Sequence, residues 1–354
     1  MSRGIKTFLY SAGLVLLALL CAAGYAAYEA KNFLESPAQS TDEERLFDVQ
    51  PGATMAQAAQ QLEKQGLVRN ARYFVWLARY KKVGGKLQAG RFALRTGWRP
   101  EQVLEQLVYG KPVLSRITLR EGLTWWQAGR QLADAGYVTY ADFTAVMHDP
   151  EFLRHYGIPF ASAEGFLMPD TYLLKKPEKP DAASTRAVCG RLVDTFWLKT
   201  KSLWPNGKKP NADELRRILT LASIVERETA FDDERPRVAG VYANRLRMGM
   251  PLQADPTVIY GIGPDFDGNL RRRDLDNEAN AYNTYKHPGL PPGPICSPGI
   301  RAIKAAITPE QHSFLYFVAI TDGGRHAFNT SLEGHNKSVR EYLNNRKKQP
   351  SSAQ

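Results

Sequence analysis

The sequence predicts an α+β protein made of one N-terminal apolar helix, a small module and a larger mixed α/β domain. An uncharged stretch at residues 8–28 has the length of one membrane-spanning helix. From residue 54 onwards, helical periodicities follow one another, bounded by capping residues and glycines. Two strand-like segments at 314–320 and 325–330 flank a glycine turn, which is typical of a hairpin.

Composition and charge limit the possible classes. The chain has 354 residues, of which 43% are hydrophobic and 23% charged, as in an ordinary globular protein. This excludes a disordered protein and a polytopic membrane protein. The net charge of +11 suits an anionic partner such as nucleic acid, anionic lipid or a cell-wall polymer. Because Lys and Arg are dispersed along the chain, we favour a solvated basic surface as the explanation of this charge.

The apolar stretch at 8–28 predicts a retained transmembrane anchor. Basic residues precede it and mainly acidic residues follow it, so the positive-inside rule puts residues 1–7 in the cytoplasm and the rest outside. A cleaved signal peptide, with its apolar core at 14–20, is the alternative. In both interpretations the rest of the chain is exported from the cytoplasm, which excludes a nucleic-acid partner. Residues 29–45 then form a polar linker.

An internal repeat follows the linker. Eight positions recur 70 residues later, and in the first copy they are Gly52, Thr54, Gln57, Ala58, Gln61, Leu62, Gly66 and Val68. Each copy predicts a glycine turn, a helix of about ten residues and a glycine C-cap. Second helices are expected at 71–80 and 140–147. The first copy continues into a strand at 91–94 and a helix at 99–108. This unit resembles LysM-type glycan-binding modules, and the alternative is a packing domain without a ligand.

Residues 213–229 predict a buried helix, because apolar side chains cover most of its circumference. Asn211 or Asp213 can cap its start. Two carboxylates lie near its end, Glu226 and Glu228. At 100° per residue they project about 160° apart, so periodicity does not choose between them.

Electrostatics favours Glu228 as a functional acid. It lies in the last turn, where the helix dipole disfavours a carboxylate, and burial raises the pKa of a carboxyl group further. A glutamic acid that is protonated near neutral pH can donate a proton to a leaving oxygen. In the alternative interpretation both carboxylates are ion-pair partners. The candidate arginines are Arg217, Arg227 and Arg245.

Other chemistries find little support. A hydrolytic glycosidase needs a second carboxylate at about 5–9.5 Å, and the candidates are Asp170, Asp232, Asp233 and Asp255. The sequence contains no serine nucleophile elbow and no phosphate-binding glycine motif. The three cysteines, Cys21, Cys189 and Cys296, form no zinc spacing, and the scattered histidines do not either. Cys189 and Cys296 are either one disulfide or two free thiols. We expect no metal and no cofactor.

The segment 253–285 is rich in groups that bind sugars. Planar amides and aromatic faces are typical contacts of carbohydrates, although Asn and Tyr are also common in loops. The candidate substrate-binding residues are Gln253, Asp255, Tyr260, Tyr282, Asn283 and Tyr285.

Six segments in order give the chain a resemblance to the endolytic murein transglycosylases, also called the YceG-like family. They are Glu164–Tyr172, Leu221–Thr229, Asn244–Gly261, Tyr282–Tyr285, Gly289–Ile295 and His326–Asn329. One mild departure is Arg227, where the family commonly has lysine.

The resemblance implies a LysM-like domain at 46–115, a catalytic domain at 116–345 and a polar tail at 346–354. It implies that Glu228 is the catalytic acid and base, supported by Glu226 and Thr229. The implied reaction cleaves the β-1,4 bond between N-acetylmuramic acid (MurNAc) and N-acetylglucosamine (GlcNAc) in nascent peptidoglycan. It leaves 1,6-anhydroMurNAc ends and terminates strand elongation.

The resemblance also implies partners and a location. Glycan strands are the substrate, cell-wall synthases (penicillin-binding proteins) are partners, and the protein sits in the bacterial inner membrane by one helix. We expect Gln253, Tyr260, Asn283 and Tyr285 to border the groove that holds Glu228. Two alternatives remain: a glycan-binding protein without activity, and a hydrolytic muramidase that uses Glu228 with Asp255 or Asp170.

Overall fold

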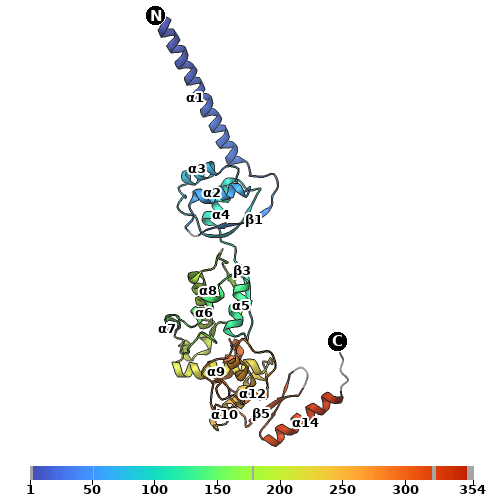
Figure 1. Cartoon of the computed structure of the whole chain (residues 1–354). Coiled ribbons are helices and arrows are strands. Elements are labelled where there is room, and N and C mark those ends of the chain that lie inside the picture. Colours follow the sequence, from blue (N-terminus) through green and yellow to red (C-terminus); the bar gives the residue numbers. More distant parts are fainter. Residues whose placement is uncertain (1–2, 51, 178, 321–323, 349–354) are drawn as a thin grey trace. The chain divides into compact units, whose positions relative to one another are not determined.

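The structure is a computed structural model that describes residues 3–50, 52–177, 179–320 and 324–348 (Figure 1). Side chains are described from residue 16 to 344, apart from residue 18 and the gaps just given. The chain divides into two compact units. The first contains residues 1–115 and 173–178, and the second contains residues 116–172 and 179–354. The prediction of an α+β architecture is confirmed, because the described residues form fourteen α-helices and three two-stranded sheets.

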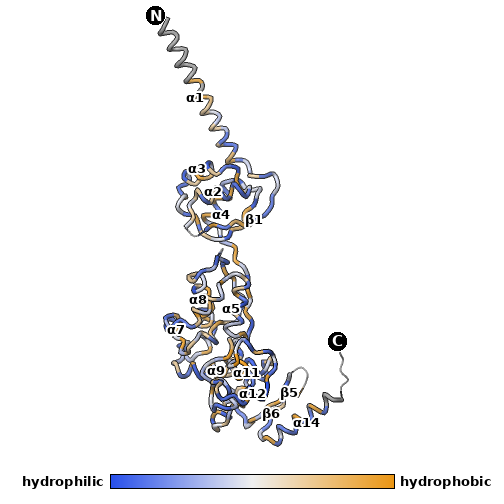
Figure 2. Tube along the Cα trace, in the orientation of Figure 1, coloured by the Kyte–Doolittle hydropathy of each residue, from blue (hydrophilic) through white to orange (hydrophobic). Residues whose placement is uncertain are grey.

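The first unit begins with α1 (Arg3–Glu35). The prediction of a membrane anchor at 8–28, and with it a single-pass location in the inner membrane, is wrong. Among the helices of the described ranges, none combines the length and the apolar character that crossing a bilayer requires. Residues 22–27 are mostly alanine and glycine, which contribute little apolar surface. Figure 2 shows that α1 becomes hydrophilic towards its C-terminal end.

The remainder of the first unit is a two-stranded sheet covered by three helices. Strand β1 (Glu44–Val49) pairs antiparallel with β2 (Gly90–Arg95), and Phe47 lies opposite Phe92. The helices are α2 (Met55–Lys64), α3 (Ala71–Tyr80) and α4 (Pro100–Tyr109). Phe47 and Phe92 are fully buried among side chains of the three helices. The likeness of this unit to a LysM module stays a prediction.

The second unit opens with the second copy of the repeat. Thr124 caps α5 in a capping box with Gln127, as Thr54 caps α2 with Gln57. The elements from here to residue 200 are β3 (Ser115–Leu119), α5 (Trp125–Asp134), α6 (Tyr140–Met147), α7 (Pro150–Tyr156), β4 (Asp170–Leu174) and α8 (Ala182–Thr200), of which the first residue of β3 and the last two of β4 fall in the first unit. Strands β3 and β4 form a two-stranded sheet.

Helix α9 (Ala212–Glu228) is the central helix of the second unit. Asn211 caps its start by accepting a hydrogen bond from Glu214 N at 2.9 Å. The helix packs against α13 (Ile300–Ile307) and α10 (Arg235–Arg247), and its residues 218–225 are all buried. This packing explains its near-continuous apolar surface. Because α9 ends at Glu228, the packing of the helix fixes the position of the Glu228 backbone.

Helix α10 is held against the segment that leads to the C-terminal hairpin. Gly240 allows this approach, because a Cβ atom there would lie 2.4 Å from Glu310 O. Asn244 Nδ2 then donates to His312 O at 2.8 Å and to Phe314 O at 3.0 Å. The orientation of α10 about its axis is therefore fixed.

The hairpin pairs β5 (Tyr316–Ala319) with β6 (His326–Asn329), with Phe317 opposite Phe328. The predicted turn at 322–324 lies partly outside the described residues. Helix α14 (Leu332–Lys348) packs on the hairpin, and α11 (Asp255–Ile262) and α12 (Arg272–Leu275) complete the unit. Cys189 and Cys296 are both buried free thiols, which decides the open question of their pairing.

Candidate active site

Glu228 lies in a cavity of about 310 Å³ within the second unit. The cavity is lined by the end of α9, by α10, by the segment that leads into α11, and by residues of β5 and α14. Its size lies at the lower end of ordinary ligand pockets. Three residues that the sequence proposed for substrate binding also line it: Gln253, Asp255 and Tyr285.

The carboxyl group of Glu228 is set to exchange a proton near neutral pH. Burial is the main cause that raises its pKa to about 7, and the negative charge of Asp255 acts in the same direction. The hydroxyl of Tyr242 donates to Glu228 Oε1 at 2.8 Å and opposes this shift, as do Arg227 and Arg245. Both protonation states are therefore populated at pH 7, which suits a group that first donates and then accepts a proton.

Tyr242 and Arg245 reach the cavity from α10. Arg245 Nε donates to Leu315 O at 2.7 Å, and its Nη1 donates to Leu252 O at 2.8 Å. The guanidinium also lies over the ring of Tyr316, 5.1 Å from its centroid. The cation is thus fixed in place by backbone carbonyls and an aromatic ring. Its charge is near enough to Glu228 to lower the pKa of that carboxyl group.

The segment before α11 is held in a strained conformation. Gln253 has φ of +52°, a left-handed value that costs a residue with a side chain about 1 kcal/mol. Its N–H donates to Thr284 O at 3.1 Å, and the next amide, of Ala254, donates to Thr284 Oγ1 at 3.0 Å. The turn places Gln253 on the cavity wall and Asp255 at the first position of α11.

Asp255 and Tyr285 form a pair beside Glu228. The Tyr285 hydroxyl donates to Asp255 Oδ1 at 2.6 Å. Burial, with the negative charge of Asp255, raises the pKa of Tyr285, so the phenol stays protonated. Asp255 therefore accepts a hydrogen bond on one oxygen and brings a second carboxylate to the cavity.

The other proposed sugar contacts lie elsewhere. Tyr260 and Tyr282 contact one another with ring centroids 4.8 Å apart, and neither lines the cavity. Tyr260 hydrogen-bonds the buried carboxyl group of Glu164, whose pKa burial raises to about 8. Asn283 is fully buried and does not line the cavity. Its side chain donates to Leu275 O at 3.0 Å and to Asn277 O at 2.9 Å, which organises the loop after α12.

The second glutamate of the helix, Glu226, has a different environment. It forms a buried ion pair with Arg235, with Nη2 2.9 Å from Oε1, and its Oε2 accepts from Gly299 N at 2.8 Å. The ion-pair interpretation thus holds for Glu226. Its partner, however, comes from α10 and is none of the three arginines that the sequence suggested. We assign Glu226 to the packing of α9 against α10 and α13.

Thr229 caps the C-terminal end of α9. Its hydroxyl donates to Glu234 Oε2 at 3.2 Å and accepts from Phe231 N at 3.1 Å. Glu234 is buried and also binds the ring of His326, with Nδ1 2.8 Å from Oε2. These contacts connect Thr229, the residue after Glu228, to the hairpin, whose strand β5 contributes Tyr316 and Phe317 to the cavity lining.

The remaining candidate carboxylates are engaged away from the cavity. Asp170 pairs with Lys199 at 2.8 Å, and Asp233 pairs with Arg325 at 2.7 Å. Asp232 pairs with Arg235 and Arg301. Of the four candidates, Asp255 alone lines the cavity. The described residues contain no group of three or more His, Cys, Asp or Glu side chains that could hold a metal ion.

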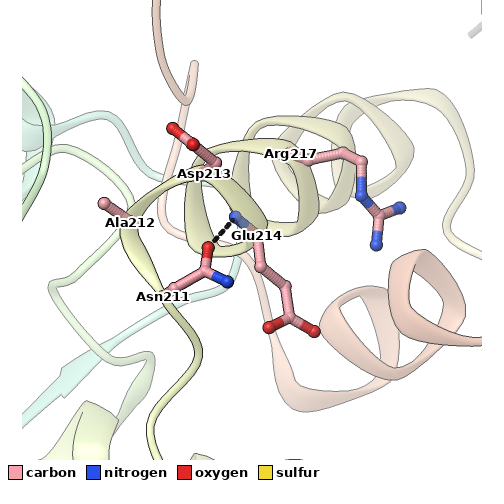
Figure 3. Close-up of a pocket in the computed structure, with 5 residues that line it drawn as sticks. All are labelled: Asn211, Ala212, Asp213, Glu214 and Arg217. Atoms are coloured by element: carbon pink, nitrogen blue, oxygen red, sulfur yellow. Dashed lines mark hydrogen bonds between the residues drawn. The ribbon is translucent and has the colours of Figure 1, made fainter.

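A second hollow lies at the other end of α9 (Figure 3). It is formed around the N-cap residue Asn211 and includes Glu214 and Arg217. The 17-residue helix separates this end from Glu228 by about 24 Å along its axis. We interpret this hollow as the surface of a capped helix start.

Sequence reasoning missed Tyr242, Arg245 as a cavity residue, and His335. Tyr242 follows Glu228 by fourteen positions on a different helix, and no spacing rule connects two such residues. The one available signal was that Arg245 falls in the long motif 244–261. His335 reaches the cavity from α14, which carries no recognisable site motif.

Comparisons with known proteins decide the family. The model of the YceG-like family matches residues 47–341. The chain belongs to the YceG-like family. A relative from Bacillus subtilis (strain 168), named endolytic murein transglycosylase, is 28% identical over 91% of this chain and 91% of its own length. A relative of the same name from Streptococcus pneumoniae (strain R6) is 30% identical over 97% of this chain and 66% of its own length.

A solved structure agrees with this assignment. The crystal structure of a YceG-like protein from Listeria monocytogenes is 29% identical and has a TM-score of 0.54. The match covers 84% of this chain and 99% of that chain. The resemblance stated from the sequence is confirmed, and so is the prediction of an enzyme of the lytic transglycosylase class.

Proposed function

We propose that this YceG-like protein is an endolytic peptidoglycan lytic transglycosylase in which Glu228 serves as acid and then as base. The observation that carries the proposal is a single carboxyl group of pKa about 7 in a cavity, held by a tyrosine hydroxyl. Such a group can be protonated before the reaction and ionised during it. The names of the relatives support murein as the substrate.

In the first step Glu228 gives its proton to the glycosidic oxygen between MurNAc and GlcNAc. The bond from that oxygen to the muramyl C1 breaks, and GlcNAc leaves with a free 4-hydroxyl. The 2-acetamido group of MurNAc stabilises the positive charge that develops at C1. Tyr242 donates to the carboxylate that Glu228 has become, which lowers the free energy of this intermediate state.

In the second step the Glu228 carboxylate takes the proton of the muramyl 6-hydroxyl. The freed oxygen attacks C1 and closes a 1,6-anhydro ring, so no water is consumed and Glu228 returns to its protonated form. One group performs both transfers, and no protein nucleophile is required. Gln253, Asp255 and Tyr285 are proposed to contact the sugar, because they line the same cavity.

The domain bounds and the cellular context are proposed from the family resemblance alone. We propose residues 116–345 as the catalytic domain, residues 46–115 as a LysM-like domain, and strand termination together with cell-wall synthases as the cellular context. A hydrolytic muramidase is the second candidate, because Asp255 supplies a second carboxylate at the cavity of Glu228. A glycan-binding protein without activity is the third.

One experiment separates the three candidates. The purified full chain is incubated with peptidoglycan glycan strands, and the new ends are identified by mass spectrometry. We expect 1,6-anhydroMurNAc ends from the wild-type protein and a loss of at least about 100-fold in Glu228→Gln. Reducing MurNAc ends would support the muramidase, and an absence of new ends would support the binding protein.

A further inference from the structure

A row of three aromatic rings lies outside the Glu228 cavity, within the second unit. Trp126 of α5 contacts Tyr260 of α11 with ring centroids 4.9 Å apart, and Tyr260 contacts Tyr282 with centroids 4.8 Å apart. The three residues come from separate segments of the chain, and each is partly exposed to solvent. None of them lines the cavity. We call Trp126, Tyr260 and Tyr282 the aromatic row.

The internal repeat shows that Trp126 occupies an outward position of its helix. Thr54 and Thr124 cap the corresponding helices of the two copies, each in a capping box with the glutamine three positions later. Two positions after the threonine, the first copy has Ala56, which is exposed, and the second copy has Trp126. The second copy thus carries the largest side chain at a position that faces solvent in the first copy, and Tyr260 covers it only in part.

A buried carboxyl group supports the row from inside. Glu164 is 1% exposed, and its two oxygens accept from Trp125 N at 2.9 Å and from Gly165 N at 3.1 Å. The same carboxyl group hydrogen-bonds the hydroxyl of Tyr260. One side chain therefore holds both the start of α5 and the ring of Tyr260. Because burial raises the pKa of Glu164 to about 8, this support is mostly uncharged at pH 7.

The third ring is held by the loop that precedes it. Asn280 Oδ1 accepts from Tyr282 N at 2.9 Å, and Asn280 Nδ2 donates to Val258 O at 3.1 Å. Gly261 allows this approach, because a Cβ atom there would lie 1.8 Å from Asn280 Oδ1. The loop therefore lies directly on α11, and the row is ordered before any ligand binds, which lowers the entropic cost of binding.

Both segments that carry the tyrosines also reach the Glu228 cavity. Helix α11 begins at Asp255, which lines the cavity, and Tyr260 follows five positions later, about 7.5 Å further along the helix axis. Tyr282 precedes the cavity residue Tyr285 by three positions. The row is therefore near enough to the cavity for one polymer to occupy both.

The chemistry of the row suits a sugar ring. The face of an aromatic ring carries partial negative charge, and the C–H groups on one face of a β-linked pyranose carry partial positive charge. Among the described residues the hydroxyl of Tyr282 has no hydrogen-bond partner, and it is not one of the buried unpaired atoms. It is therefore accessible to a sugar hydroxyl. The row thus offers an apolar surface with one polar group at its end.

We propose that Trp126, Tyr260 and Tyr282 form a second sugar subsite, in which a pyranose ring of the glycan strand packs on the exposed part of the row while another part of the strand occupies the Glu228 cavity. The identity of the ligand as a glycan strand rests on the proposed function. The row takes no part in proton transfer. It adds affinity for strands that are long enough to reach it, so the enzyme prefers long strands to short fragments.

The first test compares substrates of two lengths. Trp126→Leu keeps an apolar side chain but removes the flat ring, so kcat/KM for long glycan strands should fall about tenfold. Short fragments that fill only the cavity should react as with the wild type, and Trp126→Phe should recover most of the loss. The matched control is Trp197→Leu, because Trp197 is also partly buried but packs on Phe166 and Phe196. Equal losses for long strands and short fragments in Trp126→Leu would overturn the proposal and indicate a packing role.

The second test records contact without catalysis. In the Glu228→Gln background, binding of long glycan strands should change the tryptophan fluorescence of the full chain. Trp126→Phe should bind nearly as tightly but lose most of this change, whereas Trp197→Phe should keep it. A change that persists in full in Trp126→Phe would show that the strand does not touch Trp126, and the subsite would be refuted.

The binding measurement also separates the subsite from the proposed function. If the wild-type chain forms no anhydromuramyl ends, the lyase proposal fails, and the affinity of the Trp126→Leu variant for long strands still decides whether the row binds glycan. We expect that affinity to be about tenfold weaker than that of the Glu228→Gln parent. Equal affinities would overturn the subsite and leave the lyase proposal intact.

Discussion

The hydroxyl of Tyr242 lies 2.8 Å from Glu228 Oε1 and donates a hydrogen bond to it. The two residues come from neighbouring helices, α9 and α10, and Tyr242 is itself 2% exposed. Its ring meets Phe317 of the hairpin edge to face, with centroids 5.8 Å apart. The bond therefore orients the carboxyl group, and it limits how far burial raises the pKa of Glu228.

The first prediction concerns the pH dependence of activity. Tyr242→Phe removes the donor that favours the carboxylate, so the pKa of Glu228 should move above its value of about 7. Because the protonated acid starts the reaction, activity falls as pH rises through that pKa. The alkaline limb of the pH profile of kcat/KM should shift upward by about half a pH unit to one unit.

Tyr109→Phe is the control for this shift. Tyr109 is 65% exposed in the first unit, and losing its hydroxyl should leave the profile unchanged. An alkaline limb that stays in place or moves to lower pH in Tyr242→Phe would show that Tyr242 does not set the protonation of Glu228.

The second prediction concerns stability. The pKa of Glu228 is about 7 in the folded chain and near 4.5 when unfolded. Below pH 4.5 both states carry the proton, so this group does not affect the free energy of unfolding. Between pH 4.5 and 7 the unfolded state ionises first, and the wild-type protein loses stability. Above pH 7 the loss is complete, on the order of 3 kcal/mol.

Glu228→Gln replaces this carboxyl group with a neutral amide of similar shape. Its melting temperature should equal that of the wild type near pH 4, exceed it progressively up to pH 7, and keep a constant advantage beyond. Thermal unfolding between pH 4 and 9 measures the difference, with exposed Glu63→Gln as control. A difference that does not vary with pH would contradict a raised pKa.

The third prediction concerns Asn283. Because its amide donates to Leu275 O and Asn277 O inside the protein, Asn283→Ala should lower the free energy of unfolding by about 2–3 kcal/mol. Activity should fall through displacement of Tyr285, whose N–H donates to Asn283 Oδ1 at 3.0 Å. Asn269→Ala, an exposed asparagine, is the control. An unchanged melting temperature with reduced turnover would instead indicate direct contact with the substrate.

Local signals predicted the helix that carries Glu228 well. Residues 213–229 were expected and Ala212–Glu228 are observed, because the Asn211 cap and the apolar periodicity act within a few positions. The same local reasoning failed for the partner of Glu226. The sequence offered Arg217, Arg227 and Arg245 as partners, whereas the arginine that reaches Glu226 is Arg235, at the start of the next helix.

The cavity itself could not be predicted from spacing, because it is a product of tertiary packing. Tyr316 reaches it from the C-terminal hairpin, 88 residues after Glu228, and His335 reaches it from α14, 107 residues after Glu228. In the segment 253–285, the presence of a polar side chain does not distinguish residues that line the cavity from residues that hold the backbone. Gln253 and Asn283 are both amides, yet one faces the cavity and the other bonds backbone carbonyls.

The last prediction separates the two glutamates. Glu226 and Arg235 are both buried, with side chains 5% and 6% exposed, and without Glu226 the guanidinium of Arg235 keeps only the more exposed carboxylates of Asp232 and Glu121 as partners. Glu226→Gln should therefore lower the free energy of unfolding by about 3 kcal/mol. The folded fraction should keep most of its activity, because Glu226 does not line the cavity.

A double-mutant cycle tests this assignment. When Glu226 and Arg235 are both replaced by methionine, no buried charge of the pair remains, and the double variant should be more stable than the sum of the two single changes predicts. Release of anhydromuramyl ends is measured on the same samples at a temperature where all are folded. If Glu226→Gln folds and melts like the wild type but forms no product, then Glu226 acts in the chemistry. The division between a structural Glu226 and a catalytic Glu228 would then be wrong, since ion-pair loss without a change in stability cannot explain a loss of turnover.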